Sequence, residues 1–87
     1  SPKGITVRDQ RTRWGSCSNR GTLSFNWRLV MAPPEILNYV VVHELAHLKV
    51  PSHSPEFWKL VGQHYPDFKA ARQWLKDNAG ALHPDLN

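Results

Sequence analysis

Three of the five histidines lie between positions 43 and 53, in the segment HELAHLKVPSH. If this segment begins as a helix, His43 and His47 are one turn apart on the same face, and their imidazoles can converge on one ion. Glu44 follows about 100° around the helix, where its carboxylate can reach a water at that ion but is poorly placed as a ligand. Two imidazoles and such a carboxylate indicate the chemistry of a zinc hydrolase.

A third ligand should come from beyond the helix. Pro51 is expected to end the helix, so a chain that turns back after it can bring His53 to the ion and leave one coordination position for water. Glu56 is the alternative, because one class of H-E-x-x-H enzymes takes a glutamate from a later helix. His53 is nearer the helix end and is preferred. We expect His64 and His83 to be surface residues.

The motif alone could arise by chance in a helix, but its surroundings favour a metal site. The segment from Ile36 to Leu48 is apolar on nearly every side, which predicts a buried helix. Titratable side chains buried in such a helix need partners, and a metal would satisfy His43, Glu44 and His47 together. The alternative is a structural cluster of histidine and glutamate without an ion.

Three helices should position these residues. Prolines 33 and 34, followed by Glu35, mark the start of a helix from about Pro34 to Lys49. Ser54 as N-cap and Pro55 behind it open a second helix that ends near Tyr65. A third helix is expected over 67–78, with its apolar side chains facing inward and a glycine just past its end.

The first third of the chain predicts strands. Residues 5–10 favour a short strand with Ile5 and Val7 on one side, and residues 18–21 favour a hairpin turn. Residues 22–27 should form the returning strand, with Leu23, Phe25 and Trp27 on one face. Because a two-stranded ribbon is marginal alone, its apolar face should rest on the helices, which gives an α+β fold.

The length of 87 residues predicts one domain, 1–87, in which a bound metal would add to stability. The single cysteine, Cys17, excludes an internal disulfide and indicates a reducing, cytoplasmic location; we expect a packed thiol rather than a nucleophile. No apolar run approaches the roughly 20 residues of a membrane span, and no signal-peptide pattern opens the chain. Because the chain begins Ser1-Pro2 without methionine, it is expected to be a piece of a longer protein.

The formal net charge is +4, and five arginines fall in the first third of the chain. This distribution leaves two alternatives to a peptidase. A basic ribbon beside the metal could bind nucleotide phosphates and make the enzyme a phosphoanhydride hydrolase, although no glycine-rich phosphate loop is present. The chain could also be a non-catalytic, zinc-stabilised module that binds nucleic acid or protein. The five arginines in the first third of the chain are Arg8, Arg11, Arg13, Arg20 and Arg28.

Several segments together resemble the YgjP-like metallopeptidase family, which is similar to the SprT-like and WSS-type zinc proteases. The resemblance covers Val7 to Leu75. The segments are RTRWGSCS at 11–18, GTLSFNWRL at 21–29, Pro34-Glu35, YVVVHELAHL at 39–48 and HSPEFW at 53–58.

The resemblance implies a reduced zincin fold, in which a small antiparallel sheet packs on an active-site helix and two further helices follow. It implies zinc as cofactor, with His43, His47 and His53 as ligands and Glu44 as general base, and a peptide or protein as substrate. The resemblance also implies that full-length members of the family carry an additional N-terminal part.

By similarity to zincins, the strand 22–27 would be the sheet edge along which an extended peptide pairs. Ser24, Asn26 and Arg13 are the candidate substrate contacts. The chain departs from the metzincin pattern, because Val50 replaces its glycine and Met31 precedes the histidine motif.

Overall fold

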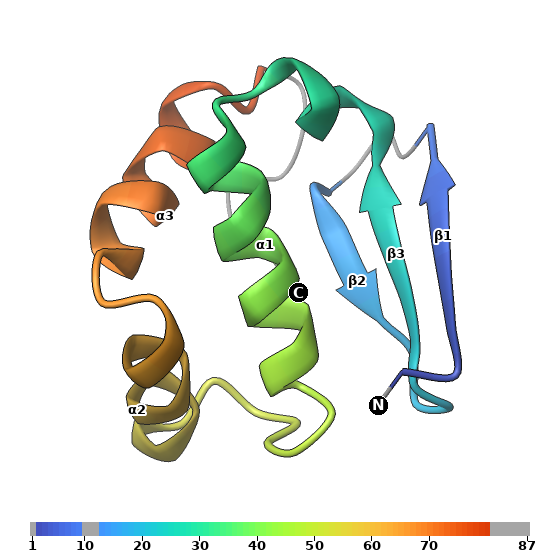
Figure 1. The fold of residues 1–87 in the computed structure, drawn as a ribbon, viewed down its shortest axis with the longest axis vertical. Helices are drawn as coiled ribbons and strands as arrows, with labels where there is room; N and C mark the ends of the chain where they lie inside the picture. The colour runs from blue at the N-terminus through green and yellow to red at the C-terminus, as the bar shows by residue number, and fades with distance from the viewer. Residues whose placement is uncertain (1, 10–12, 81–87) are drawn as a thin grey trace.

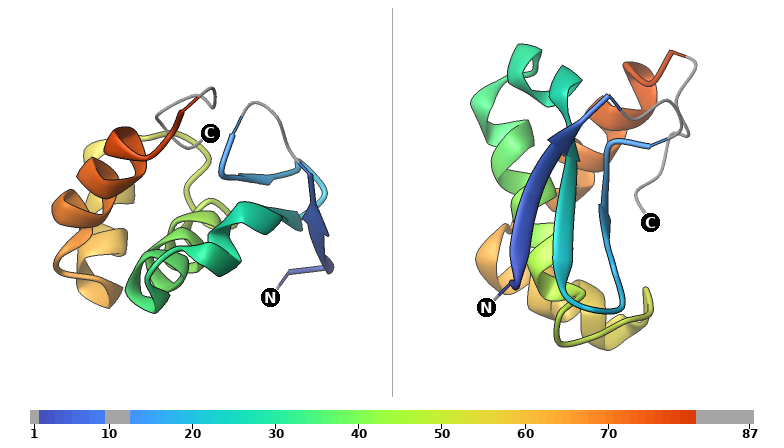
Figure 2. Two further views of the ribbon diagram at one scale, coloured as in Figure 1. Left: turned by 90° about the horizontal axis from the view of Figure 1, so that it is seen from above. Right: turned by 90° about the vertical axis from the view of Figure 1, so that its right-hand side faces the viewer.

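The computed structural model describes residues 2–9 and 13–80, which form a small sheet and three α-helices (Figure 1). Helix α1 lies between the sheet on one side and α2 and α3 on the other, as both Figure 1 and Figure 2 show. This confirms the predicted α+β class. The elements in order are β1 (Gly4–Arg8), β2 (Gly15–Cys17), β3 (Thr22–Asn26), a 3₁₀ helix η1 (Trp27–Met31), α1 (Pro34–Ala46), α2 (Pro55–His64) and α3 (Phe68–Asp77).

The sheet is mixed rather than antiparallel, and its strand order is β1-β3-β2. Strand β1 runs parallel to β3, whereas β2 runs antiparallel to it. A hairpin turn lies at 18–21 as predicted, with the Gly21 amide donating to the Ser18 carbonyl at 3.0 Å and Gly21 adopting the positive φ that favours glycine. The expectation that 22–27 returns through this turn to pair with the strand at 5–10 is wrong, because β1 is parallel to β3. The turn joins β3 to β2, a strand that sequence analysis missed because three residues of sequence Gly-Ser-Cys show no apolar alternation.

Strand β3 is the middle strand, so the expectation that 22–27 forms the sheet edge is wrong. The parallel pairing of β1 places a strand on one side of β3, and the hairpin places β2 on the other. The strands with an outer edge are therefore β1 and β2.

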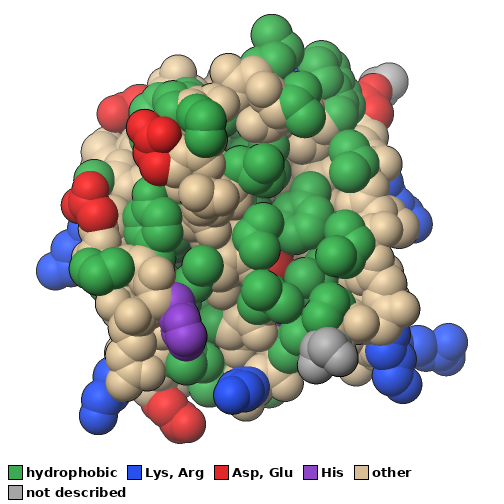
Figure 3. All heavy atoms as spheres, in the orientation of Figure 1, with side chains coloured by type: hydrophobic (Ala, Val, Ile, Leu, Met, Phe, Trp, Pro, Cys, Tyr) green, Lys and Arg blue, Asp and Glu red, His purple; other side chains and the backbone are tan. Residues whose placement is uncertain are grey.

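The apolar face of the sheet is only partly covered by α1. Leu23 and Phe25 on the central strand are buried, but their neighbours in the register, Ile5 and Val7, are 63% and 65% exposed. Strand β1 lies on the far side of β3 from β2, beyond the reach of the helix. Trp27 leaves the strand for η1 and is 40% exposed, contrary to the predicted shared face. Apolar side chains accordingly cover much of the face in Figure 3.

The helices follow the predicted signals closely. Helix α1 begins at Pro34 but ends at Ala46, three residues before the expected Lys49, because the chain tightens into turns there. The hydroxyl of Ser54 accepts from the Phe57 amide and caps α2, as predicted.

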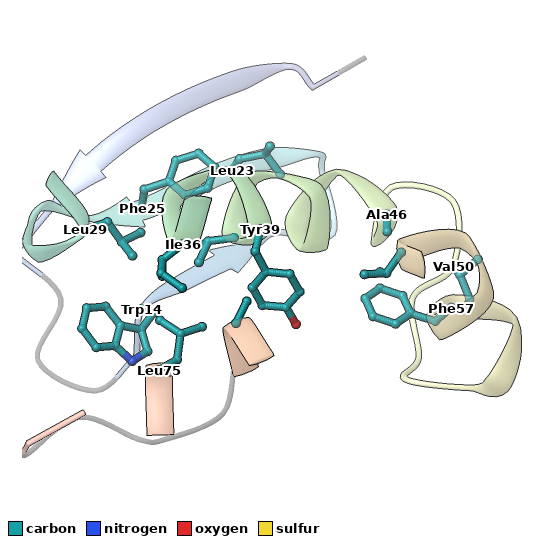
Figure 4. Packing of buried hydrophobic residues seen from close by; sticks show 13 residues of the cluster. Trp14, Leu23, Phe25, Leu29, Ile36, Tyr39, Ala46, Val50, Phe57 and Leu75 are labelled. Carbon is teal, nitrogen blue, oxygen red and sulfur yellow. The ribbon is translucent and has the colours of Figure 1, made fainter. Parts of the chain in front are cut away.

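The core runs along α1 (Figure 4). Tyr39 is fully buried near the middle of the cluster. Trp14 and Leu75 pack toward one end of it, and Val50 and Phe57 pack at the other, where the histidines lie.

Candidate metal centre

The last turn of α1 presents two of the predicted ligands. His43 is only 2% exposed, and His47 is the C-cap residue, which keeps helical dihedral angles. Their spacing of four residues puts both side chains on one face of the helix. The ring centroids lie 4.9 Å apart.

The segment after α1 returns the third histidine to the same place. The Val50 amide donates to the Ala46 carbonyl at 2.9 Å, and Pro51 follows where the helix cannot continue. Nε2 of His53 lies 3.1 Å from Nε2 of His47 and 3.3 Å from Nε2 of His43. The structure therefore brings together the three histidines that the sequence predicted.

These distances fit a shared metal ion. Two nitrogens bound at 2.0–2.1 Å to a tetrahedral zinc ion are about 3.3 Å apart. A ring nitrogen has one in-plane site, which holds either a proton or a lone pair, so Nε2 of His53 cannot form a good hydrogen bond with both neighbours. A cation accepts all three lone pairs, and imidazole nitrogen is a donor that zinc prefers.

Two of the rings are oriented by contacts at Nδ1. Nδ1 of His47 lies 3.1 Å from the Val50 carbonyl oxygen, which can only accept, so the proton is on Nδ1 and the lone pair on Nε2. Nδ1 of His43 lies 3.1 Å from the hydroxyl of the buried Tyr39. The carbonyl partner fixes the tautomer that His47 needs as a metal ligand, whereas the Tyr39 hydroxyl, which can donate or accept, orients the His43 ring.

Glu44 is fully buried and faces β2 rather than open solvent. A methyl group built on Gly15 would lie 3.3 Å from Oε2 of Glu44 and 3.2 Å from Cγ1 of Val40. The absence of a side chain at Gly15 thus lets the strand approach this carboxylate. Gly15 was not among the residues predicted for the site, because nothing in the segment WGSC marks its approach to a residue distant in sequence.

Cys17 lies on the same strand, and its thiol is held in the neutral form. Burial raises the pKa of the Cys17 thiol, and the negative charge of Glu44 raises it further. A thiol with a raised pKa is a poor nucleophile and a poor metal ligand at neutral pH. This agrees with the expectation that Cys17 is a packing residue.

The other candidate ligands lie outside the cluster. Glu56 is exposed in the first turn of α2 and does not belong to the group of converging donors in the described chain. His64 is exposed and lines a groove of about 220 Å³ with Lys49 and Leu60. His83 lies outside the described residues.

The candidate substrate contacts have different surroundings. The hydroxyl of Ser24 lies 2.8 Å from that of Thr6 on the neighbouring strand. The amide of the buried Asn26 donates to the Arg13 carbonyl and accepts from the Arg28 amide, which caps η1. Both side chains therefore hold the sheet together, whereas Arg13 is exposed just before β2.

A helix that carries two histidines and a glutamate beside a small sheet, with a third histidine returning from the next loop, is the arrangement of a zincin-like metallopeptidase. The fold is similar to that of a solved metallopeptidase. The crystal structure of the metallopeptidase zymogen of Pyrococcus abyssi abylysin superposes with a TM-score of 0.82 at 22% sequence identity, covering 95% of this chain and 85% of that chain.

Residues 1–78 match the family described as YgjP-like, metallopeptidase domain. The chain belongs to this family, as its sequence motifs predicted. No curated protein sequence matches the chain. Among the described helices, none has the length and apolar character needed to cross a bilayer.

Proposed function

We propose that this chain is a zinc-dependent endopeptidase in which His43, His47 and His53 bind the metal and Glu44 is the general base. The convergence of three Nε2 atoms, at 3.1 and 3.3 Å from one another through His53, is the observation that carries the proposal. Family membership supports peptide or protein as the substrate.

The chain's own residues divide the chemistry between them. Zinc, when bound, supplies a Lewis acid that polarises the scissile carbonyl and makes a nearby water more acidic. Glu44 follows His43 on α1, and its carboxylate takes the proton from the attacking water and delivers it to the leaving amine. Because Glu44 is buried, bulk water does not screen the interaction between its carboxylate and the proton that it accepts.

The proposed path for the substrate is the outer edge of β2, which replaces the strand expected from sequence. Strand β2 pairs with β3 on one side, and its backbone at Gly15 lies against Glu44. An extended peptide that pairs with the other side of β2 would pass beside that carboxylate, with backbone hydrogen bonds providing affinity. Arg13, exposed just before this strand, is the remaining candidate for a contact with the substrate.

The test is Glu44→Gln, with zinc content and hydrolysis measured on the same preparation. We expect the variant to retain zinc by elemental analysis and to lose activity on a denatured protein by about 10²–10⁴-fold, the usual contribution of a general base. Glu56→Gln is the matched control, because Glu56 is an exposed carboxylate outside the cluster and should keep both properties.

A Glu44→Gln enzyme with wild-type activity would remove Glu44 from the base role. Release of phosphate from nucleotides, measured in parallel, separates the peptidase from the phosphoanhydride hydrolase. Activity on nucleotides with none on protein would overturn the proposed substrate class.

A further inference from the structure

The third histidine differs from the other two in how the fold holds it. His43 and His47 project from the last turn of α1, whereas His53 is an exposed residue of the loop between α1 and α2. A loop side chain has more rotational freedom to lose on binding a metal than one set on a helix. The structure must therefore restrain the His53 ring by some other contact.

Two aromatic side chains in the first turn of α2 supply such contacts. Phe57 meets the His53 ring edge-on with centroids 5.1 Å apart, whereas the indole of Trp58 lies face to face with it. The His53 and Trp58 rings are stacked at 28°, with centroids 5.7 Å apart. The indole also meets His43 edge-on at 5.9 Å. A single aromatic ring thus contacts both a helix-borne ligand and the loop-borne ligand.

Helix α3 in turn holds the indole. Phe68 stacks on Trp58 at 18° with centroids 5.3 Å apart, and the guanidinium carbon of Arg72 lies 4.3 Å from the ring centroid. Phe68 and Arg72 are one turn apart on α3, so both reach the ring from the same helix. Trp58 is half-buried, and its two contacts with α3 restrict the orientation of its ring.

We propose that Trp58 is a positioning residue for the metal centre, which acts by fixing the plane of the His53 imidazole so that Nε2 points at the other two ligands. The inference rests on the proposed metal site. Stacking restricts the rotation of the His53 ring, and the electron-rich face of the indole also favours the imidazole once a metal draws charge from it. Trp58 thereby raises the affinity for zinc without binding it.

The variant that tests this is Trp58→Leu, with the dissociation constant for zinc measured by competition with a chromophoric chelator. We expect the constant to rise by about 10–100-fold, the usual effect of losing an outer contact to a metal ligand. Trp58→Phe keeps a flat ring and should recover most of the loss. Trp58→Met fills a similar volume without a flat face and replaces the leucine variant if that variant does not fold.

Trp74→Leu is the matched control. Trp74 is another half-buried indole, and it packs against Trp14 at 6.1 Å. Its loss should lower the unfolding temperature of the metal-free protein and leave the zinc dissociation constant unchanged. The effect of Trp58→Leu should also vanish in a His53→Ala background, because the positioned ring is then absent.

Two results would overturn the positioning role while leaving the metal site intact: a Trp58→Leu protein that binds zinc as tightly as wild type, or a loss of affinity that persists without His53. If the wild-type chain itself does not bind zinc, the proposed metal site fails, and this inference fails with it.

Discussion

Glu44 lies where α1, which carries two of the histidines, packs against strand β2. It follows His43 on α1, and its carboxylate lies beside Gly15 on β2. The same charge raises the pKa of Cys17, two residues further along that strand. The thiol of Cys17 is therefore a reporter of whether Glu44 is ionised in the folded protein.

We predict that Glu44→Gln lowers the pKa of Cys17. The carboxylate disfavours the thiolate, so its replacement by a neutral amide moves the thiol toward its ordinary pKa, although burial, the larger cause, keeps it raised. The rate of alkylation as a function of pH, measured with chelator present so that no metal charge interferes, gives the pKa. Alkylation of the variant should reach half its maximal rate at lower pH than wild type.

Glu35→Gln is the control for this titration, because Glu35 is an exposed carboxylate in the first turn of α1. It should leave the pKa of Cys17 where it is in wild type. An unchanged pKa of Cys17 in a folded Glu44→Gln protein would mean that Glu44 is not charged beside the thiol.

Because the pKa of Cys17 is raised on folding, the contribution of this thiol to stability is complete below the pKa of the unfolded thiol. It is lost as the pH rises through the pKa of the folded thiol.

The sequence predicted the histidine cluster because helical periodicity and one proline are local signals. Positions 43 and 47 share a face in any helix, and Pro51 ends that helix before His53. Gly15 could not be predicted in the same way. Its importance comes from a close approach to Glu44, a residue distant in sequence, and no local pattern encodes such an approach.

Strand β2 and helix α1 meet at Gly15, and this contact sets the distance between the sheet and the proposed base. A β-carbon at this position would lie 3.2–3.3 Å from Val40, Glu44 and the Ser24 carbonyl, so these neighbours would have to move. Gly62 on α2 is different, because a methyl group there would lie 3.5 Å from Phe68, an ordinary contact distance.

We predict opposite effects of alanine at these two glycines. Gly15→Ala should lower the free energy of unfolding by about 1–3 kcal/mol, as inserted methyl groups in well-packed sites do. Gly62→Ala should raise it by about 0.5–1 kcal/mol, since alanine is the better helix former and the site has room. Urea denaturation of the metal-free proteins measures both changes. A Gly15→Ala protein as stable as wild type would show that β2 and α1 are not tightly packed.

The caps explain why helices were predicted better than strands. Ser54 and Pro55 mark the start of α2 within two residues, and the structure places the helix there. The parallel pairing of β1 with β3 depends on how the chain crosses between them, and no residue of either strand signals it. The exposure of Ile5 and Val7 could not be predicted either, because an alternating strand does not reveal where the covering helix ends.

In the whole molecule, the histidine cluster lies where the loop before α2 meets the end of α1. Helix α1 is the central element, with the sheet on one side and α2 and α3 on the other (Figure 2). A metal held by His43, His47 and His53 would cross-link these parts at one end of the core. A chain of 87 residues buries a limited core, so such a link should contribute substantially to its stability.

We predict that zinc raises the thermal stability of the protein and that chelation reverses the effect. A ligand that binds only the folded state adds about 2.7 kcal/mol at a free concentration one hundred times its dissociation constant. His53→Ala should lose most of this zinc-dependent gain because two imidazoles hold the ion more weakly than three. His64→Ala is the matched control, since His64 is exposed on α2 outside the cluster and should retain the full gain. Thermal unfolding followed by circular dichroism, with zinc and then with chelator, measures each shift in unfolding temperature. An equal zinc-dependent rise in both variants would show that His53 is not a ligand.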